Sequence, residues 1–492
     1  MALMFTLLPL YYSDAYYEIL NDKSIIFDIF SRILIGVVAA TLIVNLILDI
    51  HKKKLAQDVK AELSKTNALD IVMLLFLIAT GFSLLHTYDF ETAFDGSIAW
   101  CVGGYALILG VIIYFMISRF YSGKNDVWAY LFFGVLAVVI IGILDRFGND
   151  FLVMHDEIPL SWNIFISTIG NVNFWGAFLS VVVPFFMLLP IYLKSRVNRF
   201  WVYLLLGICH FSLFIVKTNS PFLGIGVAGL FVIWFSFRDI KRIKNLALEG
   251  IVFSFSGVIA EYLWKHPEAF ARPMDTDSVS VILMTTKLYL LPGILGIALI
   301  LFVLVLDRLK EGVREKIKFF VEKVFTKIWL GLIVLGVVGV VVYVVQNFDM
   351  QFFNYRGSIW YFSWHGFLDG DLGDKVIGVG PGLLDVVTRE QIENADFFVE
   401  WDHYYNTAHN DVLEYLVTMG VIGAALKIAM YIVPYVMFAK NKTNEAQKAA
   451  ILAGLTGYLA QGMVTGPYIF VYVFYIIFLG VFSAYDRMEQ LS

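Results

Sequence analysis

The segment IWLGLIVLGVVGVVVYVVQ, residues 328–346, contains no charged side chain. A helix of about 20 apolar residues is long enough to cross about 30 Å of hydrocarbon. Lipid offers no hydrogen-bond partner for a free backbone N–H or C=O group, so a spanning segment of this kind must be helical. We therefore expect this segment to be a membrane-spanning helix.

Similar apolar segments recur along the whole chain. Of its 492 residues, 59% are hydrophobic and only 16% are charged, with a mean hydropathy of +0.76. Soluble chains carry about 25% charged residues. The expected fold is an all-α polytopic membrane protein with about 13 (12–14) transmembrane helices and one long extracytoplasmic loop. The expected spans are 30–49, 69–86, 97–118, 126–145, 165–193, 200–216, 220–237, 249–264, 279–306, 328–346, 411–438, 448–464 and 467–485.

Lys and Arg residues predict the orientation, because they accumulate in cytoplasmic connections. Alternate connections carry 25 Lys and Arg residues on one side and 8 on the other, with 3 more inside spans. The basic set includes 51–68 and 307–327, which we expect in the cytoplasm. Acids alternate with bases in 307–327, which is typical of a solvated connector and not of a nucleic-acid site. The long connection 347–408 is then expected outside.

We divide the chain into three parts on this basis. Residues 1–346 are expected to form a bundle of about 10 spans, residues 347–408 an extracytoplasmic loop whose catalytic candidates are named below, and residues 409–492 about 3 further spans. The first 12 residues are apolar but lack the basic start and cleavage site of a signal peptide. They can be an interfacial segment or a short first span, and the sequence does not decide between these.

The outer connection has a composition that suits sugar binding. It holds ten acidic and three basic residues together with many aromatic ones. Sugar C–H faces pack on aromatic rings while the hydroxyl groups form hydrogen bonds, although an aromatic belt at the membrane interface is an alternative explanation. The sequence GVGPG at 378–382 lacks the Lys-Ser/Thr of a P-loop. We interpret it as a tight turn that brings the backbone close to another group.

Asp369 and Asp371 resemble the paired acids that hold a metal in some sugar transferases. Two acids at this spacing arise easily by chance in so acidic a connection, and we expect no metal here. His365 and His403 lie in the same connection. We interpret each of them as a surface or aromatic-packed histidine, although either is a possible base.

His409 is the leading candidate for a general base. Imidazole is the usual base near neutral pH, and the positive end of a helix dipole would keep the ring neutral. Asp411 and Glu414 follow within one helical turn, and either could orient the ring. The alternative is that His409 only helps Asn410 and Asp411 to cap the helix that starts there.

The outer connection and the span after it carry a set of motifs that resembles the O-antigen ligase and O-antigen polymerase family. The motifs are Arg356 with Ile359 and Trp360, Ile377–Gly382, Ala408–Asn410 with Leu413 and Glu414, and Met419–Gly423. Two looser matches are Ser167–Asn173 and Lys217–Pro221, the latter with Pro221 where the family has Arg.

The resemblance implies a membrane glycosyltransferase of surface polysaccharide biosynthesis in a bacterial cytoplasmic (inner) membrane. Such an enzyme takes an oligosaccharide from an undecaprenyl-diphosphate-type carrier on the outer side and transfers or polymerises it. It would be inverting, independent of metal and without a cofactor. The implied partners are a lipid-linked donor, a saccharide, lipid or polymer acceptor, and membrane lipid, but no nucleic acid. Whether the chain is a ligase or a polymerase stays open.

The resemblance also assigns roles to individual residues. His409 and Arg356 would be catalytic, and a guanidinium can hold phosphate oxygens with two parallel hydrogen bonds. The expected substrate-binding residues are Lys217, Asn410, Gly378, Gly380, Gly382, Trp360 and Glu414. Lys217 would replace the cation that is missing at position 221.

A transporter or flippase for a lipid-linked sugar is the alternative function. The number of spans suits it, but the sequence has no internal repeat and no paired broken helices of the kind that mark a midplane site. Lys287 and Lys427 fall inside predicted spans and are functional candidates, since a buried ammonium is costly in lipid. We expect Lys287 to face a cavity for the carrier lipid, and Lys427 to reach the interface or to pair.

Overall fold

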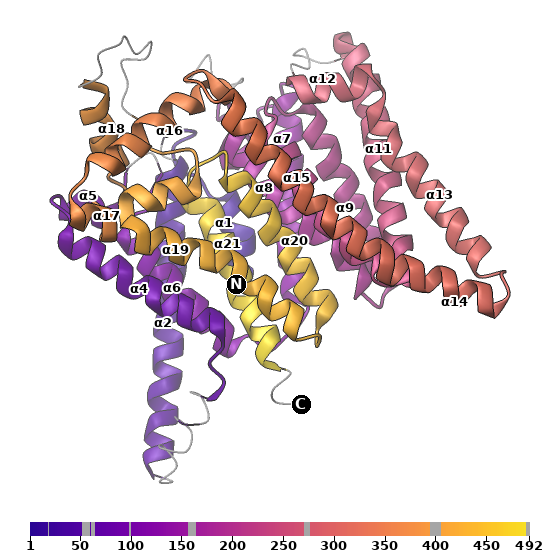
Figure 1. Cartoon of the computed structure of the whole chain (residues 1–492). Helices are drawn as coiled ribbons and strands as arrows, with labels where there is room; N and C mark the ends of the chain where they lie inside the picture. The colour runs from indigo at the N-terminus through magenta and orange to yellow at the C-terminus, as the bar shows by residue number, and fades with distance from the viewer. Residues whose placement is uncertain are drawn as a thin grey trace.

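The computed structural model describes residues 1–488 apart from 18, 52–59, 61–63, 98–99, 156–163, 270–275 and 394–404. In the described residues the secondary structure is helical, except for a short antiparallel pair of strands, β1 (Phe165–Ile166) and β2 (Gly170–Asn171). Eleven described helices are long and apolar enough to cross a membrane. The chain is therefore an all-α polytopic membrane protein (Figure 1).

The helices follow one another along the whole chain. The first are α1 (Ala2–Leu10), α2 (Ile19–His51), α4 (Ala68–His86), α5 (Phe90–Asp95), α6 (Gly104–Phe120) and α7 (Val127–Arg146). Next come α8 (Val172–Leu188), α9 (Arg196–Ile215), α10 (Ser220–Phe237), α11 (Ile243–Lys265), α12 (Ser278–Thr285) and α13 (Leu291–Leu306). The last are α14 (Glu311–Phe319), α15 (Thr326–Asn347), α16 (Phe352–Asp369), α17 (Leu372–Ile377), α18 (Leu384–Glu393), α19 (Asp411–Lys440), α20 (Glu445–Gly462) and α21 (Ile469–Met488).

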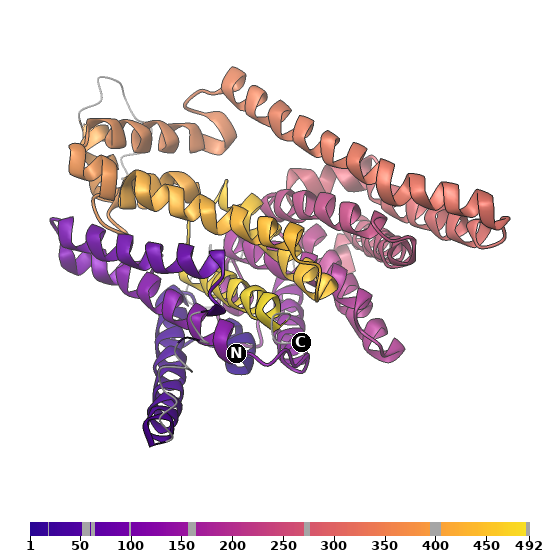
Figure 2. The same cartoon turned by 60° about the horizontal axis from the view of Figure 1, so that its bottom comes forward.

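The centre of the bundle is formed by α21 and α8. The apolar window of α21 is 100% buried in the protein and that of α8 is 83% buried. In contrast, the apolar window of α15 is 0% buried. Figure 2 shows α15, in orange-red, along the edge of the bundle, and Figure 1 shows α13 and α14 at the right-hand edge. A helix that is apolar all round is either central or in contact with lipid, and these helices show both outcomes.

Each of the thirteen predicted spans contains a helix, and two of these helices are not among the eleven candidates. One is α6, which has only 17 residues. The other is α20, whose 18 residues include Glu445 and Lys448 in the first turn. The count of thirteen spans therefore stays a prediction.

The boundaries of several predicted spans are wrong; the helix that contains 30–49, for example, already begins at Ile19. The helix within 97–118 begins only at Gly104. The helix within 165–193 begins at Val172, because Asn171 caps it by accepting a hydrogen bond from the Asn173 N–H at 2.8 Å. The span 279–306 is two helices, separated at Lys287, whose φ is +60°. The ammonium of Lys287 pairs with Glu261, which gives the charge a protein partner.

The N-terminal apolar segment forms the short helix α1 inside the bundle. Its residues Phe5 and Leu8 are fully buried, and Phe5 stacks on Trp128 with ring centroids 6.0 Å apart. The buried ammonium of Lys23 donates a 3.1 Å hydrogen bond to the Pro9 carbonyl near the end of α1. A cation is stabilising there because the last carbonyls of a helix carry negative partial charge.

The connection 347–408 is structured along its described length. It forms α16, α17 and α18, which pack on one another and on α19. The α17 helix also packs against α4. Figure 1 shows these three helices gathered at one end of the molecule with α5. This arrangement places Arg356 of α16 and the start of α19 in the same region.

Candidate functional site

The turn before α19 is held by side chains of the first turn of the same helix. Asn410 is the N-cap, and its side-chain oxygen accepts hydrogen bonds from the N–H groups of Val412 and Leu413 at 3.1 and 3.0 Å. The buried carboxylate of Glu414 accepts a bond from the Ala408 N–H at 2.7 Å and one from the Thr407 hydroxyl at 3.1 Å. Asn410 and Glu414 therefore shape the turn that carries His409.

His409 occupies a constrained position in this turn. Its φ is +45°, and its ring meets the Trp100 ring edge-on with centroids 5.8 Å apart. Within the described part of the chain, Nδ1 of His409 is buried without a hydrogen-bond partner. Neither carboxylate of the first turn orients this ring, since Asp411 pairs with Lys427 and Glu414 holds the turn. The capping role belongs to Asn410 and not to His409.

The pKa of His409 is lowered to about 4. Burial of the ring is the larger cause, and the positive charge of Arg356 is the second. Both disfavour the protonated form. The ring is therefore neutral at neutral pH, as expected from the sequence, although the causes are burial and Arg356.

Arg356 presents a cation to this region. It follows three residues with positive φ at the start of α16. Its Nε donates to the Val464 carbonyl at 2.8 Å and its Nη1 to the Phe353 carbonyl at 3.2 Å. Burial lowers the pKa of Arg356. No carboxylate of the described residues forms an ion pair with Arg356, so its charge is not neutralised by an acid there.

The segment 463–468, between α20 and α21, brings the two candidate residues together. The Met463 carbonyl accepts a hydrogen bond from the Asn410 side chain at 3.3 Å, and the adjacent Val464 carbonyl accepts from Arg356. A Cβ on Gly466 would lie 1.8 Å from the hydroxyl oxygen of Thr407. From the sequence, this segment contains only a break between two predicted spans, although its Gly-Pro pair also indicates a turn.

Trp100 is a second part of the site that the sequence did not reveal. Its indole N–H donates to the Asn406 side chain at 2.8 Å, and its carbonyl accepts from the Ile469 N–H at 3.1 Å. Its ring also lies 5.6 Å from that of Phe174. Trp100 therefore links the His409 turn to the start of α21 and to α8.

The two loosely matching motifs meet each other in the structure. The Thr218 hydroxyl donates to the Asn173 side chain at 3.0 Å. Pro221 lies in the first turn of α10, as predicted. Lys217 precedes this contact and is partly buried. Phe174, which follows Asn173, packs on Trp100, and Trp100 contacts the ring of His409. The two motifs are therefore connected to His409 through the rings of Phe174 and Trp100.

The glycine turn packs on the chain itself. Gly378, Gly380 and Gly382 have φ values of +81°, +124° and +78°. The Gly380 N–H donates to the Thr418 carbonyl at 2.9 Å, and a Cβ on Gly378 would lie 2.3 Å from the backbone of Thr418. The close approach expected of this turn is confirmed, and its partner is α19. A substrate-binding role for the three glycines stays a prediction.

The remaining aromatic and imidazole candidates lie on α16. Trp360 is partly buried, packs on Phe352 at 6.1 Å, and has a buried indole N–H with no partner in the described chain. His365 stacks on Tyr361 at 3.9 Å and contacts the Tyr361 carbonyl through Nδ1 at 2.9 Å. The other rival base, His403, is outside the described residues.

The acids considered for a metal have structural roles. Asp369 accepts a hydrogen bond from Gln391 at 3.0 Å. Asp371 caps α17 and, with His86 and Asp374, forms a group whose possible ligand atoms all lie within 4.8 Å of one another. His86 already contacts Asp374 at 3.1 Å, and His86 and Asp371 are exposed. These residues could hold a divalent cation, but their contacts are accounted for by the helix cap and by the contact between His86 and Asp374.

No known protein-family model matches this chain, and no curated protein does.

Proposed function

We propose that the chain is a membrane glycosyltransferase that transfers or polymerises an oligosaccharide from a polyprenyl diphosphate carrier on the outer side of a bacterial cytoplasmic membrane. The observation that carries the proposal is the pairing of two groups. A cation without an acidic partner among the described residues, Arg356, lies near enough to a neutral imidazole, His409, for its charge to lower the pKa of that ring. A transferase with an anionic donor and a hydroxyl acceptor needs a cation for the first and a base for the second.

The reaction assigns one task to each group. His409 accepts the proton of the acceptor hydroxyl, whose oxygen then forms a bond to the anomeric carbon of the donor sugar. The bond from that carbon to the diphosphate oxygen breaks, and its electron pair leaves with the diphosphate. Attack from the face opposite the leaving group inverts the configuration. Arg356 stabilises the negative charge that grows on the diphosphate.

Donor binding would also strengthen the base. The charge of Arg356 is one of the two causes that lower the pKa of His409. A diphosphate bound to Arg356 would offset this charge, so the imidazole would become a better proton acceptor once the donor is in place. The bias of Lys and Arg residues supports an extracytoplasmic position for α16–α18.

Reconstitution into liposomes that contain a lipid-linked oligosaccharide tests the proposal. We expect longer or newly attached chains with the wild type and none with His409→Ala or Arg356→Ala. Arg356→Lys should recover little, because an ammonium cannot reproduce the two parallel hydrogen bonds. His365→Ala is the matched control, since this imidazole is stacked on Tyr361 in the same connection.

The outcomes separate the candidate functions. Wild-type turnover by His409→Ala would exclude it as the general base. If the wild type only moves the donor from one leaflet to the other without making a longer product, the chain is a flippase and the transferase proposal is wrong.

A further inference from the structure

Lys427 lies in the second half of α19 and is buried deep in the bundle. Its side chain is 1% exposed, and its ammonium lies 3.0 Å from the carboxylate of Asp411, the first residue of the same helix. An ionisable residue inside a membrane span marks a functional site by default, with its partner as part of that site. The candidate site described above does not use this ion pair.

The ion pair depends on a break in α19. Gly420 has φ +66° and ψ −171°, so the helix is divided into two halves. A straight helix would separate residues sixteen positions apart by about 24 Å, which is beyond the reach of these two side chains. Asp411 belongs to the first half and Lys427 to the second, so the pair fixes how the halves are inclined to each other.

Tyrosine rings surround the ammonium of Lys427. It lies 4.7 Å from the ring centroids of Tyr415 and Tyr475, and 5.3 Å from those of Tyr431 and Tyr458. The Tyr431 hydroxyl also donates a hydrogen bond to Asp411. Cation–π attraction grows when the cation is desolvated. Four rings and a carboxylate therefore give this buried cation a well-defined position.

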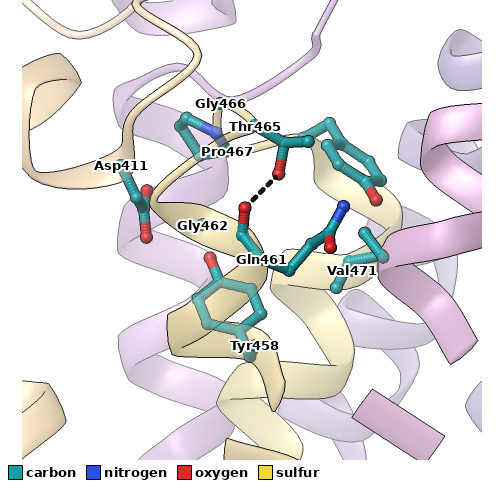
Figure 3. A pocket seen from close by; sticks show the side chains of 10 residues that line it. Asp411, Tyr458, Gln461, Gly462, Thr465, Gly466, Pro467 and Val471 are labelled. Carbon is teal, nitrogen blue, oxygen red and sulfur yellow. Dashed lines mark hydrogen bonds between the residues drawn. The ribbon is translucent and has the colours of Figure 1, made fainter. Parts of the chain in front are cut away.

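A small cavity is lined in part by Asp411 (Figure 3). Its volume of about 10 Å³ is close to that needed for one water molecule. Oδ1 of Asp411 and Nε2 of Gln461 are both buried without a partner among the described residues, and both side chains line the cavity. One water can donate to the carboxylate and accept from the amide. The charge of Lys427 disfavours a second cation there.

The position of the ion pair connects it to the candidate site. Asp411 directly follows Asn410 and His409, so any change in the direction of the first half of α19 moves the His409 turn. The cavity is also lined by Thr465 and Gly466, next to the carbonyls that bind Asn410 and Arg356. The ion pair therefore adjoins the segments that carry His409 and bind Arg356.

We propose that Asp411 and Lys427 are positioning residues, whose ion pair across the break in α19 sets the place of the His409 turn. This deepens the proposed function, because it names what holds the base beside Arg356. If the ion pair only stabilised the fold, a neutral pair of residues could replace it without moving the His409 turn.

The test compares neutral double variants in the full-length purified protein. Asp411→Asn with Lys427→Met removes the pair, and Asp486→Asn with Lys448→Met removes a matched buried pair, 3.3 Å apart, between α20 and α21. The carbethoxylation rate of His409 by diethyl pyrocarbonate is followed by mass spectrometry, with His365 as internal reference. Thermal melting reports folding. Neither measurement requires transferase activity, so this proposal and the proposed function can fail separately.

We expect the Asp411/Lys427 double variant to melt cooperatively and to change the His409 rate at least threefold. The Asp486/Lys448 control should leave that rate unchanged. Asp411→Glu keeps the charge and lengthens the link by one methylene, so it should fold and also change the rate. This single variant decides the question if the double variant does not fold. An unchanged His409 rate in folded Asp411/Lys427 or Asp411→Glu protein would overturn the proposal.

Discussion

The guanidinium of Arg356 and the imidazole of His409 are close enough for the charge of one to lower the pKa of the other. Together with burial, Arg356 brings the pKa of His409 to about 4. The two residues come from α16 and from the turn before α19, and these two segments are held close together because they bond to adjacent carbonyls, Val464 and Met463. This electrostatic coupling can be measured directly.

Arg356→Gln should raise the pKa of His409. Removing the cation makes the protonated imidazole less unfavourable, so the pKa moves up. It should stay below the ordinary value of about 6.5, because burial is the larger cause and persists. The pH dependence of the carbethoxylation rate of His409 measures this, since only the neutral ring reacts. Arg389→Gln, on the neighbouring helix α18, is the control, and an equal shift in both variants would contradict the coupling.

Gly466→Ala should destabilise the protein and disturb the His409 turn. The added Cβ would lie 1.8 Å from the Thr407 hydroxyl oxygen, which itself bonds to Glu414. Overpacking of this kind costs about 1–3 kcal/mol. Thermal melting in detergent measures the loss, with Gly331→Ala on α15 as control because nothing lies within 4 Å of its Cβ position. Adding Thr407→Ala should restore part of the melting temperature, and an undisturbed Gly466→Ala protein would show that the contact is absent.

The orientation predicts different accessibility for the two ends of the molecule. Leu372→Cys on α17 should react with a membrane-impermeant thiol reagent on intact cells, whereas Lys316→Cys on α14 should react only after the membrane is opened. Both native side chains are exposed. The native cysteines, Cys101 and Cys209, are buried and should give little background. If only Lys316→Cys is labelled in intact cells, the orientation is the opposite of the predicted one, and the proposed function loses its basis.

Lys217→Ala should weaken use of the lipid-linked donor, and Lys217→Arg should be tolerated. Lys217 lies just before Thr218, which contacts Asn173, and Pro221 occupies the position where the resembled family has a cation. Two unit charges about 4 Å apart attract by about 4 kcal/mol at an effective dielectric near 20, before desolvation. The KM for the donor measures this effect. An unchanged KM in Lys217→Ala would leave Arg356 as the cation of the site.

The existence of the spanning helices could be predicted from sequence, but their place in the bundle could not. Ile469–Met488 and Thr326–Asn347 are both apolar all round, yet one is buried and the other is exposed. Apolar length determines that a helix enters the membrane, whereas packing partners decide whether it contacts protein or lipid. The sequence does not reveal the breaks at Lys287 and Gly420, because apolar residues continue on both sides of each.

For the candidate site, the sequence indicates the reactive groups but not the residues that hold them in place. The chemistry of imidazole points to His409 and the family resemblance to Arg356, and the structure places both in the same region. The partners Trp100, Val464 and Gly466 are distant in sequence from one or both of these residues. Trp100 acts through a ring contact, Val464 through its carbonyl, and Gly466 because it has no side chain. A single sequence gives no sign of any of these three features.

The use of main-chain oxygens at Met463 and Val464 has a consequence for how this protein can vary. Replacing either residue by another of similar size leaves its carbonyl in place, so the contacts to Asn410 and Arg356 impose no particular side chain there. In a comparison of distant homologues, the central support of the site would be visible only as a constraint on small size at Gly466.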